Sequence, residues 1–425
     1  MKIIILAIGT FGDVYPYAAL AQGLQNAGYQ VTLATHQPYR DFVVGKGLSY
    51  AQIAGDPVQW EQEHKLSELV SSSRNFTGWM NKLKELADNL IPVIFASCLE
   101  ACHDMDAVVY SPLAWIGYSI SEKFKVPGIS ASLQPFLTTR SFSSPWLSAV
   151  INTGILNRLT HTLVMQLYWQ FNRYYVNHFR KEVLDLPEIR RLGPFGSSQW
   201  NNQLFLFGFS QYLIPKPEDW PANAHITGFW RFDADACYHP PEDLLDFISA
   251  GPKPVYLGFG SMPGNDNENL LDIADTAFKK AGVRGVVQIK TGNAPGKLSP
   301  NLFNAGWINH DWLFDNSSAV ICHGGVSTLA TSLRFGTPVI TIPHAWDQSF
   351  WGKRIEKAGL GISPCSRINL TSSRLARAIS EILNNPRYRN RSSEAARKIK
   401  DENGISTSVG LIDRALINRE QIPGK

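Results

Sequence analysis

Cysteines are scarce in this sequence, and long apolar runs are missing. Five of the 425 residues are cysteine, and no two are spaced as Cys-x-x-Cys, so the sequence indicates neither a zinc site nor a disulfide framework. No apolar run reaches the length of a membrane-spanning helix. The apolar run at 3–6 is too short for a signal peptide. We therefore expect a cytoplasmic protein.

A strong excess of charge of one sign is also missing. The 40 basic and 36 acidic residues give a formal net charge of +4, which does not indicate a nucleic-acid partner. The hydrophobic share of 44% and the charged share of 18% are those of a globular protein. A chain of 425 residues exceeds the size at which single cores stop growing. We expect two domains, in a monomer or weak oligomer.

Acidic residues are absent between Glu122 and Glu182. The basic residues there are Lys123, Lys125, Arg140, Arg158, Arg173, Arg180 and Lys181. Apolar residues recur at helical spacing, namely Leu147, Val150, Ile151, Ile155, Leu156, Leu159, Leu163, Leu167 and Phe171. This pattern favours helices packed on the first domain. The alternative is an acceptor-binding region that also makes peripheral contact with an anionic membrane.

The N-terminal residues predict the start of a doubly wound parallel sheet. Strands at 3–8 and 31–34 flank a helix that follows the loop at 9–16 and ends at Gly28, which is a βαβ unit. A dinucleotide fingerprint would require a third glycine in the loop and an acid after the second strand. Thr35 and His36 supply no acid, so NAD binding is only weakly supported.

Asp13 lies in that first loop, and two roles are open to it. It could cap the following helix, for which Asp is well suited. It could instead project into a cleft between the domains, where a carboxylate could remove the proton of an attacking hydroxyl. The residues alone do not decide between the two roles.

A second glycine-rich turn follows the predicted strand at 318–322. His323, Gly324 and Gly325 lead into a helix that begins near Ser327 and Thr328. Backbone N–H groups and the positive end of the helix dipole meet at such a turn, which suits an anion. We interpret it as a diphosphate pocket with His323 as a further donor able to carry positive charge. The alternative is an ordinary helix-capping turn.

The next predicted strand, at 339–342, leads into a loop with Asp347 and Gln348. Strands of a parallel sheet end at the same edge, so this loop should lie beside the turn at 323–325. A carboxylate and an amide can bind adjacent sugar hydroxyls. Trp307 precedes the same sheet edge and could stack on a base, although an isolated Trp is more often a core residue.

These motifs together resemble the nucleotide-sugar-dependent glycosyltransferases with two facing Rossmann-like domains (GT-B). The order is a Trp segment, His-x-Gly-x-x-[Ser/Thr], Gly-x-Pro and Asp-Gln. The stretches GTFGDVYP at 9–16, PVYLGFGSM at 254–262 and DQSFWGKRI at 347–355 are most similar to the sterol-glucosyltransferase-like branch. The likeness extends over nearly the whole chain. It implies an α/β fold with the ligand cleft between the two domains.

The resemblance also implies roles for individual residues. Asp13 would be the catalytic base. Trp307 would stack on uracil, while Ser261, His323, Thr328 and nearby backbone amides would bind the diphosphate. Asp347 and Gln348 would hold the sugar. The full set of expected donor-binding residues is Gly12, Ser261, Trp307, His323, Gly325, Ser327, Thr328, Asp347 and Gln348.

The sequence departs from that branch at four places near these motifs. Phe11 stands in place of Arg, and Cys322 replaces a second His. Val326-Ser327 replaces Ala-Gly, and Ala345-Trp346 replaces a smaller, glycine-containing step. The last change adjoins Asp347, so it bears on which sugar is used.

Domain boundaries and an acceptor pocket also follow from the resemblance. We expect an acceptor-binding domain at 1–238 and a nucleotide-sugar-binding domain at 239–405, with a last helix at about 406–425 returning to the first domain. Within the stretch at 132–142 and just beyond it, Gln134, Phe136 and Trp146 are expected to line the acceptor pocket. They could equally be buried structure.

The expected function is an inverting transfer of a hexose, glucose by resemblance, from a UDP-sugar to a hydroxyl of a sterol-like, lipid or polycyclic acceptor. No metal and no cofactor beyond the donor are expected, because no Asp-x-Asp pair offers an evident metal site for a sugar nucleotide. Two alternatives remain open: a nucleotide-sugar 2-epimerase of the same fold, and a non-catalytic binder of nucleotide sugars.

Overall fold

The chain folds into two units of α/β structure. The computed structural model describes residues 1–56, 59, 76–147, 153–233, 238–260, 267–289, 294–345 and 347–420. Unit 1 comprises Met1–Phe209, Lys216–Arg231 and Asn403–Lys425, and unit 2 comprises Ser210–Pro215 and Phe232–Glu402. The division therefore falls a few residues before each of the boundaries expected at 238 and 405.

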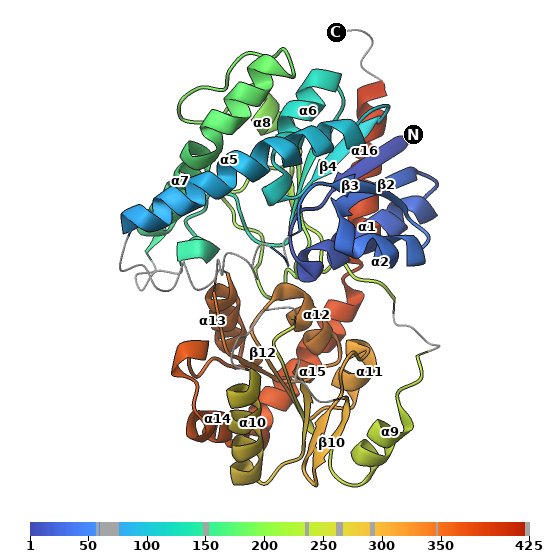
Figure 1. Ribbon diagram of the computed structural model, residues 1–425, viewed down its shortest axis with the longest axis vertical. Coiled ribbons are helices and arrows are strands. Elements are labelled where there is room, and N and C mark those ends of the chain that lie inside the picture. Colours follow the sequence, from blue (N-terminus) through green and yellow to red (C-terminus); the bar gives the residue numbers. More distant parts are fainter. Residues whose placement is uncertain are drawn as a thin grey trace. The chain divides into compact units, whose positions relative to one another are not determined.

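Unit 1 is a seven-stranded parallel sheet with strand order β3-β2-β1-β4-β5-β6-β7. The strands are β1 (Lys2–Leu6), β2 (Gln30–His36), β3 (Ser49–Ile53), β4 (Ala107–Tyr110), β5 (Gly128–Ser132), β6 (Leu204–Phe207) and β7 (Ala224–Ile226). The helices are α1 (Phe11–Asn26), α2 (Arg40–Gly45), α5 (Phe76–Ala101), α6 (Ile116–Phe124), α7 (Gly154–Glu182), α8 (Ser198–Asn202) and α16 (Gly404–Glu420), and they surround the sheet in Figure 1.

Unit 2 is a second seven-stranded sheet with order β10-β11-β9-β8-β12-β13-β14, parallel except for the β10–β11 pair. Its strands are β8 (Val255–Gly258), β9 (Gly285–Gln288), β10 (Gly296–Ser299), β11 (Leu302–Asn304), β12 (Ala319–Cys322), β13 (Val339–Thr341) and β14 (Gly361–Ile362). Its helices are α9 (Glu242–Ser249), α10 (Asn267–Ala281), α11 (His310–Asp315), α12 (Val326–Arg334), α13 (Gln348–Ala358), α14 (Ser372–Asn384) and α15 (Pro386–Asp401).

Short apolar strands covered by helices on both faces explain these sheets. Strand β12 is buried at all four positions, and Ile3 to Leu6 of β1 are fully buried. Parallel strands buried on both faces appear in a sequence as continuous apolar runs rather than as alternating patterns. The two-domain α/β prediction is therefore confirmed, each domain containing its own parallel or, in unit 2, mostly parallel sheet.

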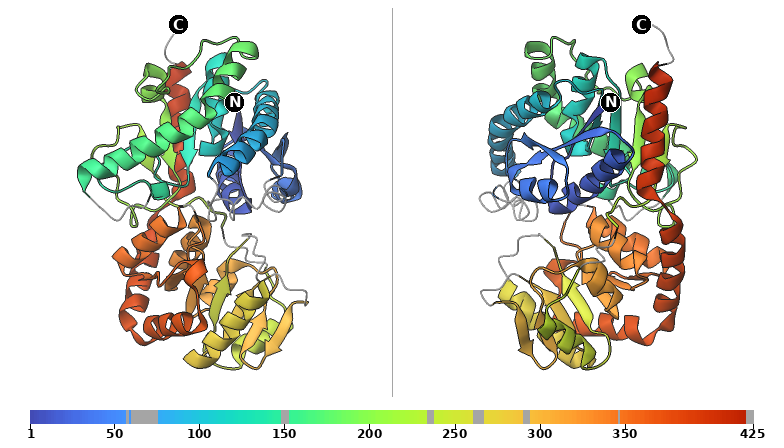
Figure 2. Two further views of the ribbon diagram at one scale, coloured as in Figure 1. Left: turned by 60° about the vertical axis from the view of Figure 1, so that its left-hand side comes forward. Right: turned by 90° about the vertical axis from the view of Figure 1, so that its right-hand side faces the viewer.

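The last helix, α16, returns to unit 1 and packs on α1 and β6; it is drawn in red in Figure 2. The approach to α1 is close, because a Cβ built on Gly23 would lie 2.1 Å from Ile405 Cγ2. Trp230 Nε1 donates a hydrogen bond to Ser408 Oγ at 2.8 Å. Trp230 Nε1 also donates to Thr227 Oγ1 at 3.0 Å, so the bond to Ser408 adds to the packing that holds α16 on unit 1.

Candidate active site

Each sheet changes winding direction next to its first strand. In unit 1, β1 pairs with β2 on one side and with β4 on the other; in unit 2, β8 pairs with β9 and with β12. Ligands of doubly wound folds bind outside the carboxyl ends of strands at such switch points. Asp13 follows β1, and His323 follows β12. Both predicted key residues thus lie at a switch point, each within its own unit.

Asp13 is the third residue of α1, and one of its oxygens is held by Thr10. Thr10 N–H and Thr10 Oγ1 both donate to Asp13 Oδ2, at 2.9 and 3.0 Å. The residue at the N-cap position is Thr10, and Asp13 forms a capping box with it, so Asp13 does help to cap α1, as the third residue of the helix rather than as the N-cap. Asp13 Oδ1 has no hydrogen-bond partner among the described residues, so this oxygen remains available to accept a proton.

Burial raises the pKa of Asp13 and of a neighbouring tyrosine. It raises the pKa of the Asp13 carboxyl, and the two hydrogen bonds from Thr10 oppose that rise. Burial also raises the pKa of Tyr39 to about 12, with a further contribution from the negative charge of Asp13. A carboxylate with a raised pKa is a stronger base when ionised, which suits proton removal from an alcohol.

Gly9 makes room for the Asp13 side chain. Its backbone has φ +141°, and a Cβ built there would lie 2.5 Å from Asp13 Oδ2. Only glycine can adopt this positive φ and also leave room for the Asp13 carboxylate without strain. Phe11, which departs from the Arg of the resembled branch, is 38% exposed and packs edge-on against Phe42 with ring centroids 4.9 Å apart. Phe11 therefore packs against another aromatic ring, a contact that an Arg at this position would not require.

The turn after β12 presents an open helix N-terminus. Gly325 is the N-cap of α12, and it has no side chain with which to cap that helix. The N–H groups in the first turn of any α-helix have no acceptor within the helix, and a glycine at the N-cap offers none from a side chain. This observation weighs against a self-contained capping turn and favours an anion site. Gly324 has φ +93° and a Cβ there would lie 3.1 Å from Gln348 O, so glycine is needed at this close approach.

His323 lies against this turn as a neutral imidazole. Burial, together with repulsion from His344, lowers the pKa of His323 to about 4. The expectation of a positively charged donor is therefore wrong for the ligand-free protein at neutral pH; His323 would donate as a neutral ring. Its Nδ1 is buried without a hydrogen-bond partner among the described residues. The ring nitrogen that faces the turn is Nε2, because a Cβ built on Gly325 would lie 2.3 Å from it. Nε2 is therefore the atom that could donate a hydrogen bond to a ligand oxygen at this turn.

Asp347 and Gln348 each use one side-chain oxygen within unit 2. Trp351 Nε1 donates to Asp347 Oδ2 at 2.9 Å. Gln348 Oε1 accepts the N–H groups of His344 at 2.7 Å and of Ala345 at 3.2 Å. Gln348 therefore shapes the 344–345 loop through its oxygen and would reach a sugar through its amide nitrogen. The expected pair does lie beside the turn at 323–325, because Gln348 O neighbours Gly324.

Trp307 lies in the loop after strand β11 of unit 2, and 81% of it is exposed. The alternative that it is a core residue is therefore wrong. An exposed indole at the carboxyl edge of the sheet that carries His323 provides a flat apolar face on which a base can stack.

We expect Trp307→Ala to weaken UDP binding, because base stacking on an aromatic side chain contributes about 1–3 kcal/mol. UDP should quench tryptophan fluorescence in the natural protein and quench it less in this variant. Trp146→Ala removes another exposed tryptophan, at 46% exposure, and serves as the control that keeps UDP affinity. Equal UDP dissociation constants for Trp307→Ala and the natural protein would contradict the stacking role.

The three expected acceptor residues have different surroundings. Gln134 is half-buried after β5, and its carbonyl accepts from Ser132 Oγ at 2.8 Å. Phe136 is half-buried beside Trp200, with ring centroids 6.3 Å apart. Trp146 is exposed. The structure thus leaves their assignment to an acceptor pocket as a prediction.

Some residues named in the predictions lie outside the described residues, among them Val150, Ile151, Ser261 and Trp346. Within the described part of the chain, no cluster of three or more His, Cys, Asp or Glu side chains could hold a metal ion. Sequence reasoning missed Thr10, which fixes Asp13, and His344, whose ring centroid lies 6.3 Å from that of His323. The three-residue spacing from Thr10 to Asp13, typical of a helix N-terminus, could have indicated the first.

Comparisons with known proteins agree with this arrangement. Residues 3–143 match the glycosyltransferase family 28 N-terminal domain, and residues 284–406 match the erythromycin biosynthesis protein CIII-like C-terminal domain. The calicheamicin glycosyltransferase CalG4 superimposes with TM-score 0.67 at 18% identity, covering 99% of this chain and 100% of that one. The glycosyltransferase of kitacinnamycin gives TM-score 0.69 at 17% identity, covering 97% and 98%. The chain thus has the GT-B glycosyltransferase fold.

Proteins with similar sequences identify the family of GT-B glycosyltransferases to which the chain belongs. The sterol 3-beta-glucosyltransferase UGT80B1 of Arabidopsis thaliana is 31% identical over 98% of this chain and 68% of its own length. The sterol 3-beta-glucosyltransferase of Komagataella phaffii is 32% identical over 96% of this chain. The chain belongs to the sterol glucosyltransferase-like family of GT-B glycosyltransferases. It spans only 34% of the length of the Komagataella relative.

Proposed function

We propose that the chain transfers a hexose, glucose by family resemblance, from a UDP-sugar to a hydroxyl of a sterol-like or other hydrophobic acceptor. The observation that carries the proposal is the pair of switch-point loops. One contains a carboxylate with Oδ2 tied to Thr10 and Oδ1 available. The other contains a helix N-terminus with glycine at its N-cap, next to Nε2 of the His323 ring.

In the proposed reaction unit 2 holds the donor. The first-turn N–H groups of α12 and the His323 ring would bind the diphosphate and stabilise its charge as it leaves. Trp307 would stack on the base, and the Asp347 carboxylate with the Gln348 amide would bind sugar hydroxyls. Because backbone dipoles would hold the leaving diphosphate, no metal ion is required in this scheme.

Unit 1 would supply the base. The Asp13 carboxylate would take the acceptor proton as the acceptor oxygen attacks the anomeric carbon, and the bond to the diphosphate would break. A single displacement with nucleophile and leaving group on opposite faces inverts the anomeric centre. A carboxylate placed in this way contributes about 10²–10⁴ in rate.

The proposal is tested by incubating the full chain with several UDP-sugars and a panel of acceptors, namely a sterol, a long-chain alcohol and a polycyclic phenol. We expect a mass gain of one hexose on the sterol with UDP-glucose, an inverted anomer by NMR, and unchanged turnover in excess EDTA. Turnover should be unchanged in EDTA because the proposed scheme requires no metal ion.

Other outcomes would each contradict a separate part of the proposal. Activity abolished by EDTA would refute the metal-free scheme, and a retained anomer would refute the single displacement. Exchange of the sugar C2 proton with solvent, without any acceptor, would identify an epimerase. Tight UDP binding with no product from any acceptor would favour a non-catalytic binder.

A further inference from the structure

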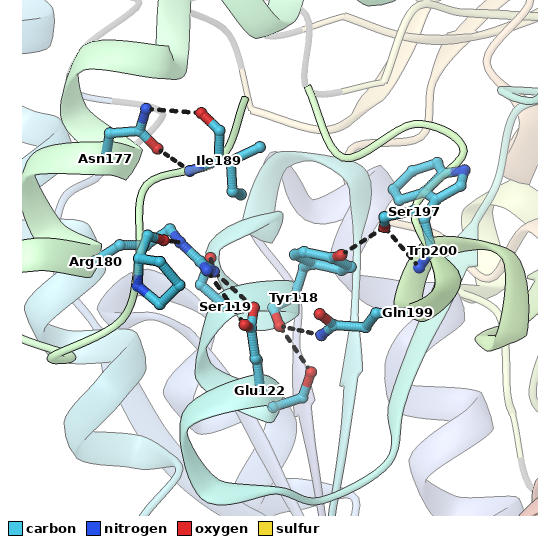
Figure 3. A network of polar contacts seen from close by, with 11 residues as sticks. Tyr118, Ser119, Glu122, Asn177, Arg180, Ile189, Ser197, Gln199 and Trp200 are labelled. Carbon is cyan, nitrogen blue, oxygen red and sulfur yellow. Dashed lines mark hydrogen bonds and ion pairs between the residues drawn. The ribbon is translucent and has the colours of Figure 1, made fainter. Parts of the chain in front are cut away.

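Each unit contains a polar network outside the residues expected to react. The network of unit 1 holds the inner face of helix α7, as Figure 3 shows. Arg180 Nη1 donates to the Glu122 carboxylate at 2.8 Å, and the Asn177 amide exchanges two hydrogen bonds with the Ile189 backbone. These contacts join protein groups to one another, and they fix the helix in place.

The outer face of α7 is apolar and exposed. The exposed residues include Ile155, Leu159, Leu163, Leu167 and Phe171. The prediction that these apolar residues pack on the first domain is therefore wrong. Among the described helices, α7 included, none is long and apolar enough to cross a membrane.

The network of unit 2 lies beside the loop that carries Trp307, and this loop is tied at both ends to the end of strand β9. At its start, Ala305 N–H donates to Val287 O at 2.8 Å. At its end, His310 Nε2 lies 3.0 Å from Oε1 of Gln288, the last residue of β9. Gln288 is therefore a direct neighbour of the loop that holds the exposed indole.

Tyr256 reaches the same amide from the neighbouring strand β8. Its O–H donates to Gln288 Oε1 at 2.8 Å and lies 3.2 Å from His310 Nε2. Strands β8 and β9 are paired, with Gly258 opposite Gln288. A Cβ on Gly258 would collide with the Tyr256 hydroxyl. Glycine at this position therefore lets the phenol extend to the carboxyl edge of the sheet.

The His310 ring is held in place by its packing. It stacks on Phe314 with ring centroids 4.8 Å apart, and it meets Tyr256 edge-on at 5.5 Å. His310 is also the first residue of α11, whose N-cap Asn309 accepts from Asp311 N–H at 2.8 Å. The ring therefore has little freedom to move away from the amide of β9.

Both neighbours donate to Gln288 Oε1 at neutral pH. Burial raises the pKa of the Tyr256 phenol well above its ordinary value, so the hydroxyl keeps its proton. Burial lowers the pKa of His310 to about 4, so its ring is neutral. The one N–H of that ring lies on Nε2, the nitrogen that faces the Gln288 oxygen. Two donors on its oxygen fix the amide with its nitrogen turned away from both.

The Gln288 nitrogen is left available to a ligand. Nε2 has no hydrogen-bond partner among the described residues, and the side chain is half-buried at the carboxyl edge of the sheet, where doubly wound folds bind their ligands. An amide nitrogen in this state offers hydrogen-bond donors only. The partner it requires is an acceptor on the molecule that stacks on Trp307.

We propose that Gln288 determines which base of the donor nucleotide the site accepts. Its amide nitrogen donates a hydrogen bond to the O4 carbonyl of a uracil stacked on Trp307. Cytosine has an amino group in place of that carbonyl, so two donors would face each other and the site rejects it. This inference rests on the proposed function, because it requires a nucleotide donor at Trp307.

The test is calorimetric titration of the full chain with UDP and with CDP, which differ only in the base. We expect the natural protein to bind UDP at least about tenfold more tightly, as is usual when a mismatched donor is left unpaired. Gln288→Glu keeps the shape but replaces the free N–H₂ with an acceptor oxygen. It should lower the ratio of UDP to CDP affinity at least about tenfold. Tyr256→Phe frees the amide to turn over, so it should lower the same ratio.

Matched controls come from the network of unit 1 in Figure 3. Gln199 Nε2 donates to Tyr118 O at 3.4 Å, and the Tyr118 hydroxyl lies 3.3 Å from Ser197 Oγ. Gln199→Glu and Tyr118→Phe make the same two chemical changes there. Both variants should keep the UDP-to-CDP ratio of the natural protein, and circular dichroism should show that all four variants are folded.

The outcomes separate this inference from the proposed function. Equal loss of UDP and CDP affinity in Gln288→Glu would show a structural role only, and it would overturn the inference while leaving the donor site in place. An unchanged ratio in that variant, or equal affinities in the natural protein, would overturn it in the same way. Failure of the natural protein to bind either nucleotide would overturn the proposed function as well.

Discussion

Asp13→Asn should lower kcat by about 10²–10⁴, the usual contribution of a positioned general base. The asparagine carbonyl can still accept the Thr10 N–H and Oγ1 hydrogen bonds that Asp13 Oδ2 now accepts at 2.9 and 3.0 Å. The start of α1 should therefore keep its shape while the proton acceptor is lost. UDP affinity should stay nearly unchanged, because the residues expected to bind the base, the diphosphate and the sugar lie in unit 2, and the substitution leaves Gly12, the expected donor contact in unit 1, in place. Steady-state kinetics and calorimetry measure the two quantities.

The pH profile gives a second test of the same role. Burial raises the pKa of Asp13, and the base is active only when deprotonated. The kcat/KM of the natural protein should thus fall as pH drops, with an apparent pKa above that of an ordinary aspartate. Asp41→Asn is the control, because the Asp41 side chain is 96% exposed and should not affect turnover. Unchanged turnover in Asp13→Asn would remove this residue from the mechanism.

Much of the fold could be predicted from the sequence because both sheets are parallel and buried. Four strands coincide with apolar runs of the sequence. These are β1, β8, β12 and β13, and the runs are 3–6, 255–258, 319–322 and 339–341. Helix α7 could not be predicted in the same way. Its leucines repeat as core residues do, and only the contacts of Arg180 and its neighbours determine which face is buried.

The residue types of the candidate site could be predicted from the sequence, but their protonation states and hydrogen bonds could not. His323 and the glycines beside it stand in the turn after β12, and Asp13 stands in the first turn of α1, shortly after β1; both places could be inferred from the predicted strands. The neutral state of His323 could not be inferred, because it results from burial beside His344. The use of Gln348 Oε1 to hold the 344–345 backbone also depends on a loop geometry that spacing does not specify.

His323→Ala should weaken UDP binding about tenfold or more, as expected when a hydrogen bond to a charged group is lost. The His323 ring and Gly325 form a coupled pair, because a Cβ built on Gly325 would lie 2.3 Å from His323 Nε2. Gly325 has φ −66°, which alanine adopts readily, so Gly325→Ala should act mainly by displacing the ring. It should weaken UDP binding by a similar factor.

A double-mutant cycle separates this coupling from simple obstruction of the phosphate site. If the ring is what Gly325→Ala displaces, adding it to His323→Ala should change the UDP dissociation constant little. If the new methyl group blocks the diphosphate directly, it should cost as much in the absence of His323 as in its presence. His178→Ala, in α7 of unit 1, is the control that keeps UDP affinity. An unaltered dissociation constant in His323→Ala would refute the phosphate role, because the ring would then contribute nothing to UDP binding.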